Sequence, residues 1–243
     1  MKVKYLGKKN SSKILDYSPS LLDSVERLHT PSSNYYGIDY WNAYEFSYLN
    51  ASSQQKLETL EIKIPADSKI TVESKSLKIY LASFYKKKFK ASINAHQLIA
   101  KDLSKLLQSK IMVSKKNFYE EAPKAFLLNR SDALVPKNKI IRYEGFRSIC
   151  PVTSQPDWAN IYIHSSSNVL DAKKIIKLLK SFKERGDFHE ACIDSIFFSL
   201  RHDFHINDLT VCGRFLRRGG IDINPIRSSK KKIFFNNFRD FNQ

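Results

Sequence analysis

Apolar and polar positions alternate most clearly along the second half of the chain. Ile161 and Ile163, for example, flank Tyr162 with the two-residue period of a half-buried strand. Pairs of such strands stand on either side of a longer segment with helical periodicity, so the predicted order is strand, strand, helix, helix, strand, strand. The four expected strands cover residues 139–149, 157–165, 208–216 and 220–228.

The segment between the strand pairs predicts two helices separated by a break at Gly186. The first covers 168–182, where apolar residues form a stripe at helical spacing, Asn168 is the expected N-cap and Asp171 falls in the first turn. The second covers roughly 188–202. Asp187 and Glu190 have the spacing of a capping box at its start, so capping is the structural interpretation of Glu190.

The first half of the chain shows a similar order of elements, with weaker periodicity. Asn94 and Gln97 have capping-box spacing at the start of its second helix. The expected elements are strands over 43–50 and 56–65, helices over 74–88 and 94–109, and a returning strand over 110–118.

The two halves of the chain share a similar order of strands and helices, and this repetition predicts both the fold class and the domains. We expect an α+β protein of two tandem units, each an antiparallel sheet with a pair of helices packed on one face. The polar, proline-containing stretch 121–137 reads as a linker, which places the units at 1–120 and 138–243.

Composition is that of a globular protein, with 42% apolar and 12% aromatic residues in a chain of 243. No apolar run approaches the roughly 20 residues that span a bilayer. The N-terminal MKVKYLGKKNSSK has no apolar segment after its lysines, so no secretory signal is expected and the predicted location is cytoplasmic.

Charge is the strongest departure from average composition. Lysine and arginine number 41 against 24 acidic residues, a formal net charge of +17. Such a chain attracts anions, whether nucleic acid, a phosphorylated cofactor or an acidic surface. A lysine-rich, solvated surface explains the same number, so charge leaves the partner open.

The chain has three cysteines and no C-x-x-C pair, which fits a reducing compartment and argues against a structural zinc site. Cys192 shares a helical apolar stripe and Cys212 lies in an apolar strand, so both are expected in the core. Cys150 differs, because it ends a strand and precedes Pro151 and a polar turn. It is the candidate nucleophile.

Cysteine chemistry requires a thiolate and, for addition to a multiple bond, an acid nearby. Asp157 is the candidate acid if burial keeps its carboxyl protonated; a turn-forming residue after Pro156 is the alternative. His189 is at the N-terminus of a predicted helix. Its side chain either faces a ligand or is only partly buried in the protein. No H-E-x-x-H or Cys–His pairing accompanies it, so no zinc site is expected.

Glycine is scarce, with seven residues and no G-x-G-x-x-G or Walker pattern, so a nucleotide site would be of a non-Rossmann kind. Residues 217–220 (RRGG) suit a phosphate-binding turn, because glycine allows close backbone approach and arginine supplies charge. A simple basic hairpin fits the same residues.

Four motifs in register, with two further stretches near the start, give the chain a resemblance to a known family. The signature ESKSLKIY at 73–80 resembles that of the queuosine-pathway nitrile reductases, the 7-cyano-7-deazaguanine reductases. Further similarity to this family, in its longer two-module form, lies in YSPSLL, YWNAYEFSYLN, CPVTSQPDWA, FHE and RRGGIDINPIRS.

The resemblance implies the tunnelling fold and a four-electron reduction of a nitrile to a primary amine with two NADPH. It implies a homodimer that takes the small molecule 7-cyano-7-deazaguanine, without metal, membrane or a direct requirement for nucleic acid. Cys150 resembles the nucleophile that forms a covalent thioimide, and Asp157 the proton donor. The remaining implied roles are substrate contacts by Val72, Glu73, Ser74, His189 and Glu190, and NADPH contacts by Ser74, Lys75, Arg218 and Gly219.

Two other functions are weighed against this one. A metal-dependent cyclohydrolase on the same fold would need a Cys/His ligand set that the sequence does not show. A non-enzymatic RNA-binding module would use the basic surface and show a steep salt dependence without turnover.

Overall fold

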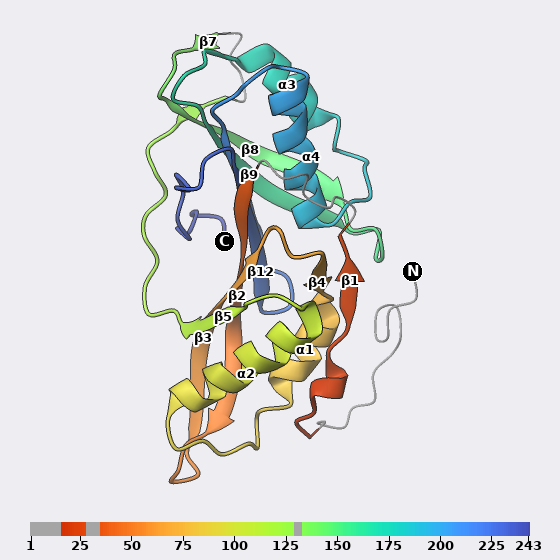
Figure 1. Cartoon of the computed structure of the whole chain (residues 1–243), viewed down its shortest axis with the longest axis vertical. Helices are drawn as coiled ribbons and strands as arrows, with labels where there is room; N and C mark the ends of the chain where they lie inside the picture. Colours follow the sequence, from red (N-terminus) through yellow and green to blue (C-terminus); the bar gives the residue numbers. More distant parts are fainter. Residues whose placement is uncertain (1–15, 28–34, 129–132) are drawn as a thin grey trace. The chain divides into compact units, whose positions relative to one another are not determined.

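The computed structural model describes residues 16–27, 35–128 and 133–243, and within them the chain is an α+β protein (Figure 1). It divides into two compact units. Of the described residues, unit 1 comprises 16–27, 40–118 and 217–222, and unit 2 comprises 35–39, 119–128, 133–216 and 223–243. The predicted α+β class is confirmed.

The strands and helices occur in the order that the periodicity predicted, together with several short additions. In the first part of the chain they are the 3-10 turn Pro19–Leu21, β1 Ser24–Glu26, β2 Tyr36–Leu49, β3 Gln55–Pro65, β4 Ile70–Val72, α1 Ser74–Ala82, α2 Ser92–Leu107 and β5 Met112–Lys115. In the second part they are β6 Phe126–Leu127, β7 Leu134–Val135, β8 Ile140–Ile149, β9 Pro156–His164, β10 Leu170–Asp171, α3 Ala172–Lys180, α4 His189–His202, β11 Thr210–Phe215 and β12 Ile221–Ser228.

Unit 1 contains the strand order β5-β3-β2 and the small antiparallel pair β1–β4. An aromatic cluster joins its helices to its sheet: the ring of Phe84, just beyond α1, contacts both Tyr80 of α1 and Phe46 of β2 at centroid distances of 5.1 and 5.4 Å. All three rings are buried. These edge-on contacts fix α1, which carries the ESKSLKIY signature, on the sheet.

Unit 2 contains the strand order β12-β11-β9-β8-β6, antiparallel except for the β6–β8 pair. Side chains from one face of β8, β9 and β11 form a single core cluster with α3 and α4, so both helices cover the same face (Figure 1). Representative members of this cluster are Ile141, Ile161, Val211, Ile175 and Ile196.

A buried ionic cluster holds α4 within unit 2. Arg227 of β12 is fully buried; its Nε donates to Asp194 of α4 at 2.5 Å and its Nη1 to Asp39 at 2.6 Å. Removing one member would leave a buried charge without its partner, which is strongly destabilising. The cluster thus fixes the helix whose first residues are His189 and Glu190.

Equivalent hairpins occur in the two units. In unit 1, Asn50 N donates to Gln54 O at 2.9 Å and Ser53 N donates to Asn50 O at 2.9 Å. In unit 2, Cys150 N donates to Gln155 O at 2.8 Å and Ser154 N to Cys150 O at 3.0 Å. Ser53 and Ser154 both have positive φ, 62° and 54°. Asn50 therefore occupies in unit 1 the place that Cys150 occupies in unit 2.

The residues before each hairpin turn repeat the same pattern. Leu49 N donates to Lys87 O at 3.0 Å, and Ile149 N donates to Arg185 O at 2.9 Å. Both acceptors lie in the connection between the two helices of their own unit. The correspondence supports a duplicated strand–helix unit, which the similar order of elements predicted.

Three helix starts differ from the prediction. The N-cap of α3 is Asp171, which accepts from Lys174 N at 3.1 Å, rather than Asn168. The predicted Asn94–Gln97 capping box is wrong, because α2 begins at Ser92 and Asn94 is its third residue, accepting from Ala91 N. The Asp187–Glu190 box is also wrong, because the N-cap of α4 is Phe188 and no side chain caps it.

The end of α1 also differs, since the helix stops at Ala82 instead of continuing to 88. The backbone N–H groups of Phe84 and Tyr85 close tight turns onto Leu81 and Ala82. The chain then leaves the helical path, and Lys87 O accepts the Leu49 N–H. Burial of Phe84 in the aromatic cluster accounts for the turn.

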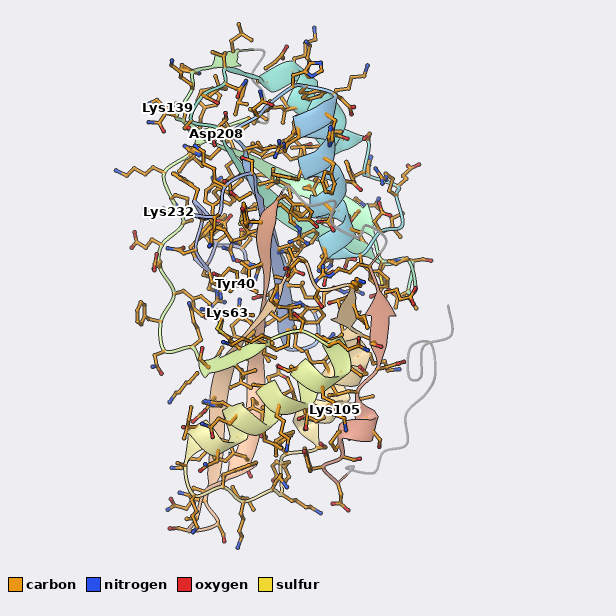
Figure 2. The ribbon with its side chains drawn as sticks, viewed as in Figure 1. Tyr40, Lys63, Lys105, Lys139, Asp208 and Lys232 are labelled. Carbon is orange, nitrogen blue, oxygen red and sulfur yellow. The ribbon has the colours of Figure 1, made fainter. Side chains whose placement is uncertain are left out.

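Two short strands, β6 and β7, fall in the segment 121–137 for which a linker was predicted; β6 pairs with β8 and β7 with β10. The boundaries 1–120, 121–137 and 138–243 stay a prediction. Among the described residues no helix is long and apolar enough to cross a membrane. Lys105, Lys139 and Lys232 exemplify the exposed lysines of this basic chain (Figure 2).

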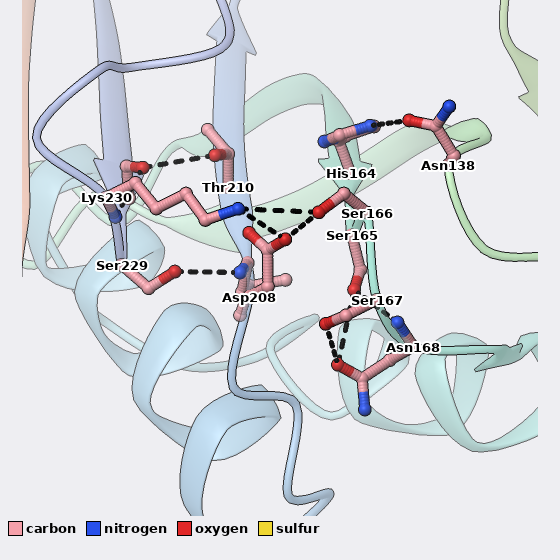
Figure 3. A network of polar contacts seen from close by, with 12 residues as sticks. Asn138, His164, Ser165, Ser166, Ser167, Asn168, Asp208, Thr210, Ser229 and Lys230 are labelled. Carbon is pink, nitrogen blue, oxygen red and sulfur yellow. Dashed lines mark hydrogen bonds and ion pairs between the residues drawn. The ribbon is translucent and has the colours of Figure 1, made fainter.

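A polar network closes the end of the β8–β9 hairpin opposite Cys150 (Figure 3). Asp208 accepts from Lys230 Nζ at 2.7 Å and also from the Ser166 hydroxyl. His164 lies 3.3 Å from Asn138 Oδ1 and stacks on Phe234. Burial lowers the pKa of His164, so the ring favours its neutral form. These contacts hold the loops at this end of unit 2.

Candidate active site

Cys150 lies immediately after β8, at the end of the strand, as predicted. The backbone bonds to Gln155 and Ser154 described above fix its position in the hairpin turn. Its side chain is partly exposed, whereas Cys192 and Cys212 are buried. Burial raises the pKa of the Cys192 thiol to about 12 and that of Cys212 to about 11. The two core cysteines are confirmed, and Cys150 is the accessible thiol.

Asp157 is the second residue of β9 and pairs across the hairpin with Ser148. The turn-forming alternative is therefore wrong, because the residue belongs to the strand. Its side chain is only 4% exposed, and its Oδ2 lies 3.3 Å from Nε2 of His189. The structure thus brings together two of the residues that the sequence singled out.

His189 is the first residue of α4, and its ring is oriented by stacking as well as by Asp157. The imidazole lies on the ring of Phe215 with centroids 4.0 Å apart and an interplanar angle of 9°. Its Nδ1 is buried without a hydrogen-bond partner. One ring nitrogen, Nε2, therefore faces the Asp157 carboxyl group, and the other, Nδ1, has no partner.

Glu190 is buried, 5% exposed, in the first turn of α4. Asp187, its expected partner in the capping box, instead forms an ion pair with Arg185 at 2.9 Å. The structural interpretation that the sequence favoured for Glu190 therefore does not hold. A carboxylate in the first turn of a helix is stabilised by the helix dipole.

Glu73 in unit 1 has the capping role that was predicted for Glu190. It is the N-cap of α1: Oε1 accepts from Lys75 N at 2.8 Å and Oε2 from Ser76 N at 2.7 Å. The side chain is 2% exposed. Each carboxylate oxygen has a further lone pair, so capping and recognition of another N–H donor are compatible. Val72 ends β4 directly before it, and Ser74 opens α1.

Residues 217–220 include a two-residue hairpin turn in unit 1, with Gly219 and Gly220 as its loop residues. Arg218 N donates to Ile221 O at 2.9 Å and Ile221 N to Arg218 O at 3.3 Å, with φ of +57° at Gly219 and +78° at Gly220. Two consecutive residues with positive φ define the turn that favours glycine at both positions. Both readings of the sequence, a basic hairpin and a phosphate-binding turn, are consistent with this geometry.

The turn lies against the signature helix, which sequence spacing did not reveal. A Cβ built on Gly219 would approach Nζ of Lys78 to 3.2 Å, so glycine lets the ammonium group of α1 lie close to the turn. A Cβ built on Gly220 would approach the carboxyl group of Glu45 to 2.7 Å, so an ammonium group and a carboxyl group both lie beside the two glycines of this turn. Ser74 and Lys75, in the first turn of the same helix, belong to the same unit.

Sequence reasoning assigned no role to Lys78 or Phe215. Lys78 is part of the signature ESKSLKIY, so its position within the motif was the available signal. Phe215 ends β11 and carries no local signal for its stacking on His189. Across the described parts of the chain, no group of three or more His, Cys, Asp and Glu side chains is arranged to hold a metal ion.

Two family models match the chain. The model described as "Nitrile reductase, 7-cyano-7-deazaguanine-reductase N-term" matches residues 15–115, and the model "QueF-like protein" matches residues 156–234. The first match includes Glu73, Lys75 and Lys78, and the second includes Asp157 and His189.

Full-length relatives agree with the family models. A protein of Coxiella burnetii (strain Dugway 5J108-111) is 33% identical over 259 aligned positions, covering 94% of this chain and 92% of the relative. A protein of Hahella chejuensis is 31% identical over 244 positions, covering 88% of this chain and 89% of the relative. Both carry the name NADPH-dependent 7-cyano-7-deazaguanine reductase. The chain, with its accessible Cys150 and its paired Asp157 and His189, belongs to the family of the NADPH-dependent 7-cyano-7-deazaguanine reductases.

Proposed function

We propose that this protein reduces the nitrile of 7-cyano-7-deazaguanine to the primary amine of 7-aminomethyl-7-deazaguanine, with NADPH, in the biosynthesis of queuosine for tRNA. The observation that carries the proposal is the accessible Cys150 in the unit that also holds the buried Asp157–His189 pair. The identity of 33% to a relative bearing this activity in its name supports it. Neither the matched families nor these relatives are named as cyclohydrolases or RNA-binding proteins.

Cys150 acts as the nucleophile. Its thiolate attacks the nitrile carbon and forms a C–S bond, while one π pair of the triple bond moves to nitrogen. Asp157 gives that nitrogen a proton, so the product is a neutral thioimide on Cys150. The partly exposed thiol at the end of β8 is accessible to a ligand, as this role requires.

His189 keeps the acid in place. Its Nε2 lies 3.3 Å from the Asp157 carboxyl group, and Phe215 restricts rotation of its ring. NADPH, when bound, supplies hydride, and two equivalents complete the four-electron reduction. Cys150 is regenerated as a thiolate when the C–S bond breaks. Asp157, protonated again from solvent, gives nitrogen the second proton that completes the amine.

Substrate recognition is assigned to Glu73, Glu190, Val72, Ser74 and His189. A carboxylate that accepts hydrogen bonds from the guanine-like N–H edge makes a charge-assisted contact and rejects bases that lack those donors. The burial of both carboxylates, 2% and 5% exposed, supports this role, because such contacts gain strength away from water.

NADPH binding is assigned to Ser74, Lys75, Arg218 and Gly219. The contact between Lys78 and Gly219 supports the assignment, since it joins the helix of the first two residues to the turn of the last two. Positive charge at this place suits a dinucleotide with an additional 2′-phosphate.

The tunnelling fold, the homodimer and the cytoplasmic location complete the proposal. The duplicated hairpins and the helices on one face of the unit 2 sheet support the fold assignment. A mass near twice 28.2 kDa by size-exclusion chromatography with light scattering would support the dimer, and a mass near 28.2 kDa would refute it.

A covalent-adduct experiment tests the function directly. The protein is incubated with 7-cyano-7-deazaguanine in the absence of NADPH, and the intact mass and the Cys150 peptide are measured. We expect a mass increase equal to one substrate on Cys150, lost after NADPH is added. An unmodified Cys150 under conditions where the substrate binds would contradict the proposed mechanism.

A further inference from the structure

Tyr44 of β2 contacts the 217–220 turn and its flanking strand at three points. Its backbone N–H donates to Gly220 O at 2.9 Å. Its hydroxyl donates to Oδ2 of Asp222 at 2.5 Å. Its ring lies under the guanidinium of Arg217, with Cζ 5.0 Å from the ring centroid. Tyr44 therefore holds both ends of the turn, all within unit 1.

Asp222 anchors the tyrosine ring. Its side chain is 1% exposed, and besides the Tyr44 hydroxyl it accepts from Nδ2 of Asn42 at 2.7 Å. A buried carboxylate with two donors at fixed positions leaves the tyrosine little freedom to rotate. The surface on which Arg217 rests is thus rigid.

Arg217 itself is exposed and has no carboxylate partner among the described residues. Its guanidinium carbon lies over the ring of Tyr44 at 5.0 Å, a cation–π contact that uses none of the N–H groups as donors. Glu45 also lies beside the turn, since its carboxyl group would lie 2.7 Å from a Cβ on Gly220, but no ion pair joins it to Arg217 among the described residues. A guanidinium that is held in position, with N–H donors available at its edge, can bind a phosphate through two parallel hydrogen bonds.

We propose that Arg217 binds a phosphate group of the dinucleotide cofactor and that Tyr44 is a positioning residue that acts through Arg217. This inference rests on the proposed function, which supplies the cofactor, and adds two residues to the contacts assigned above. The phosphate is either the 2′-phosphate, which only NADPH has, or the pyrophosphate, which NADH shares.

Binding measured without turnover tests the inference. NADPH and NADH are titrated into the full chain by calorimetry in the absence of the nitrile. Arg217→Gln should weaken NADPH binding at least tenfold, and Arg217→Lys less, because it keeps the charge but not the planar fork. An effect on NADPH alone identifies the 2′-phosphate, and an equal effect on NADH identifies the pyrophosphate. Lys105→Gln, which removes an exposed charge elsewhere in unit 1, should leave both affinities unchanged.

A double-mutant cycle tests the role of Tyr44. Tyr44→Leu should weaken NADPH binding several-fold in the wild-type background and have no further effect in the Arg217→Gln background. Tyr44→Phe keeps the ring and loses the hydroxyl that bonds to Asp222, so its effect should be smaller. Melting temperatures of the variants check folding, and Tyr44→Phe serves where Tyr44→Leu does not fold.

The outcomes separate this inference from the function on which it rests. NADPH affinity within twofold of wild type in Arg217→Gln would overturn the phosphate contact, while nitrile reduction by the wild type would stand. A Tyr44→Leu effect that persists in the Arg217→Gln background would show that Tyr44 does not act through Arg217. Wild-type protein that binds neither NADPH nor NADH would refute the proposed function itself.

Discussion

The carboxyl group of Asp157 lies 3.3 Å from Nε2 of His189, and both side chains are largely buried, at 4% and 13% exposed. β9 supplies the first residue and the start of α4 the second. The ionic cluster of Arg227 fixes α4, and Phe215 fixes the imidazole plane. An acid held in this way needs little reorganisation when a nitrogen atom beside it takes up a proton.

Cys150→Ala should reduce turnover by at least roughly a thousandfold, because no other side chain of the hairpin replaces the nucleophile. The fold should be retained, since the bonds of Cys150 to Gln155 and Ser154 are made by backbone atoms. NADPH oxidation and the melting temperature are the measurements. Cys212→Ala is the control, with activity retained; substantial activity in Cys150→Ala would remove Cys150 from the mechanism.

Adduct stoichiometry should be one substrate per chain. Unit 1 has Asn50 at the position of Cys150 in the equivalent hairpin, so it offers no thiol there. Intact-mass spectrometry at saturating substrate is the measurement. Two adducts on one chain would show a second nucleophile and contradict this assignment.

Asp157→Asn should slow reduction by roughly a hundredfold or more, the range expected for a general acid. Formation of the thioimide should suffer less than the complete reaction, because the first uses one proton from Asp157 and the second uses two. Rapid-mixing measurements of adduct formation and of NADPH oxidation separate the two steps. An equal loss in both steps would argue against the donor role.

The two buried glutamates should differ in their effects on stability. Glu73→Ala removes both bonds to the first turn of α1 and should cost about 1 kcal/mol of unfolding free energy, in addition to any loss of substrate affinity. Glu190→Ala should mainly weaken substrate binding, by roughly tenfold to a hundredfold. Denaturant unfolding and substrate titration measure the two quantities. Unchanged affinity in Glu190→Ala would refute its role in recognition.

Thiol alkylation should be selective for Cys150 in the folded protein at pH 8. With a pKa of about 11, Cys212 is about one part in a thousand thiolate at that pH, and Cys192, at about 12, is tenfold less. Raising the pH by one unit should increase these fractions tenfold. Peptide mass spectrometry after iodoacetamide treatment is the measurement, with urea-unfolded protein as control. Rapid labelling of Cys192 or Cys212 in the folded state would contradict their burial.

Periodicity predicted the strands and helices because each element buries one face. Ile161 and Ile163 point into the core with α3 and α4, while Tyr162 lies on the other face of β9 and donates to Asp240. Helix starts were less predictable, because the cap depends on where the preceding element ends. Pairing of β10 with β7 brings Asp171, not Asn168, to the start of α3.

Contacts between residues far apart in the sequence could not be predicted from the spacing of residues within motifs. Asp157 and His189 were each singled out locally, but only the pairing of β9 and the placement of α4 bring them together. The interactions of Tyr44 with Arg217 and Asp222 likewise depend on residues far apart in sequence. Family motifs supplied the candidate residues, and the structure supplies their partners.

The most direct test of the account is the stoichiometry of NADPH oxidation with 7-cyano-7-deazaguanine as substrate. NADPH consumed is followed by absorbance, and the amine product is quantified by mass spectrometry. The account predicts two NADPH oxidised for each nitrile reduced, with Cys150 as the site of the adduct. No oxidation by folded protein that binds both ligands would contradict it.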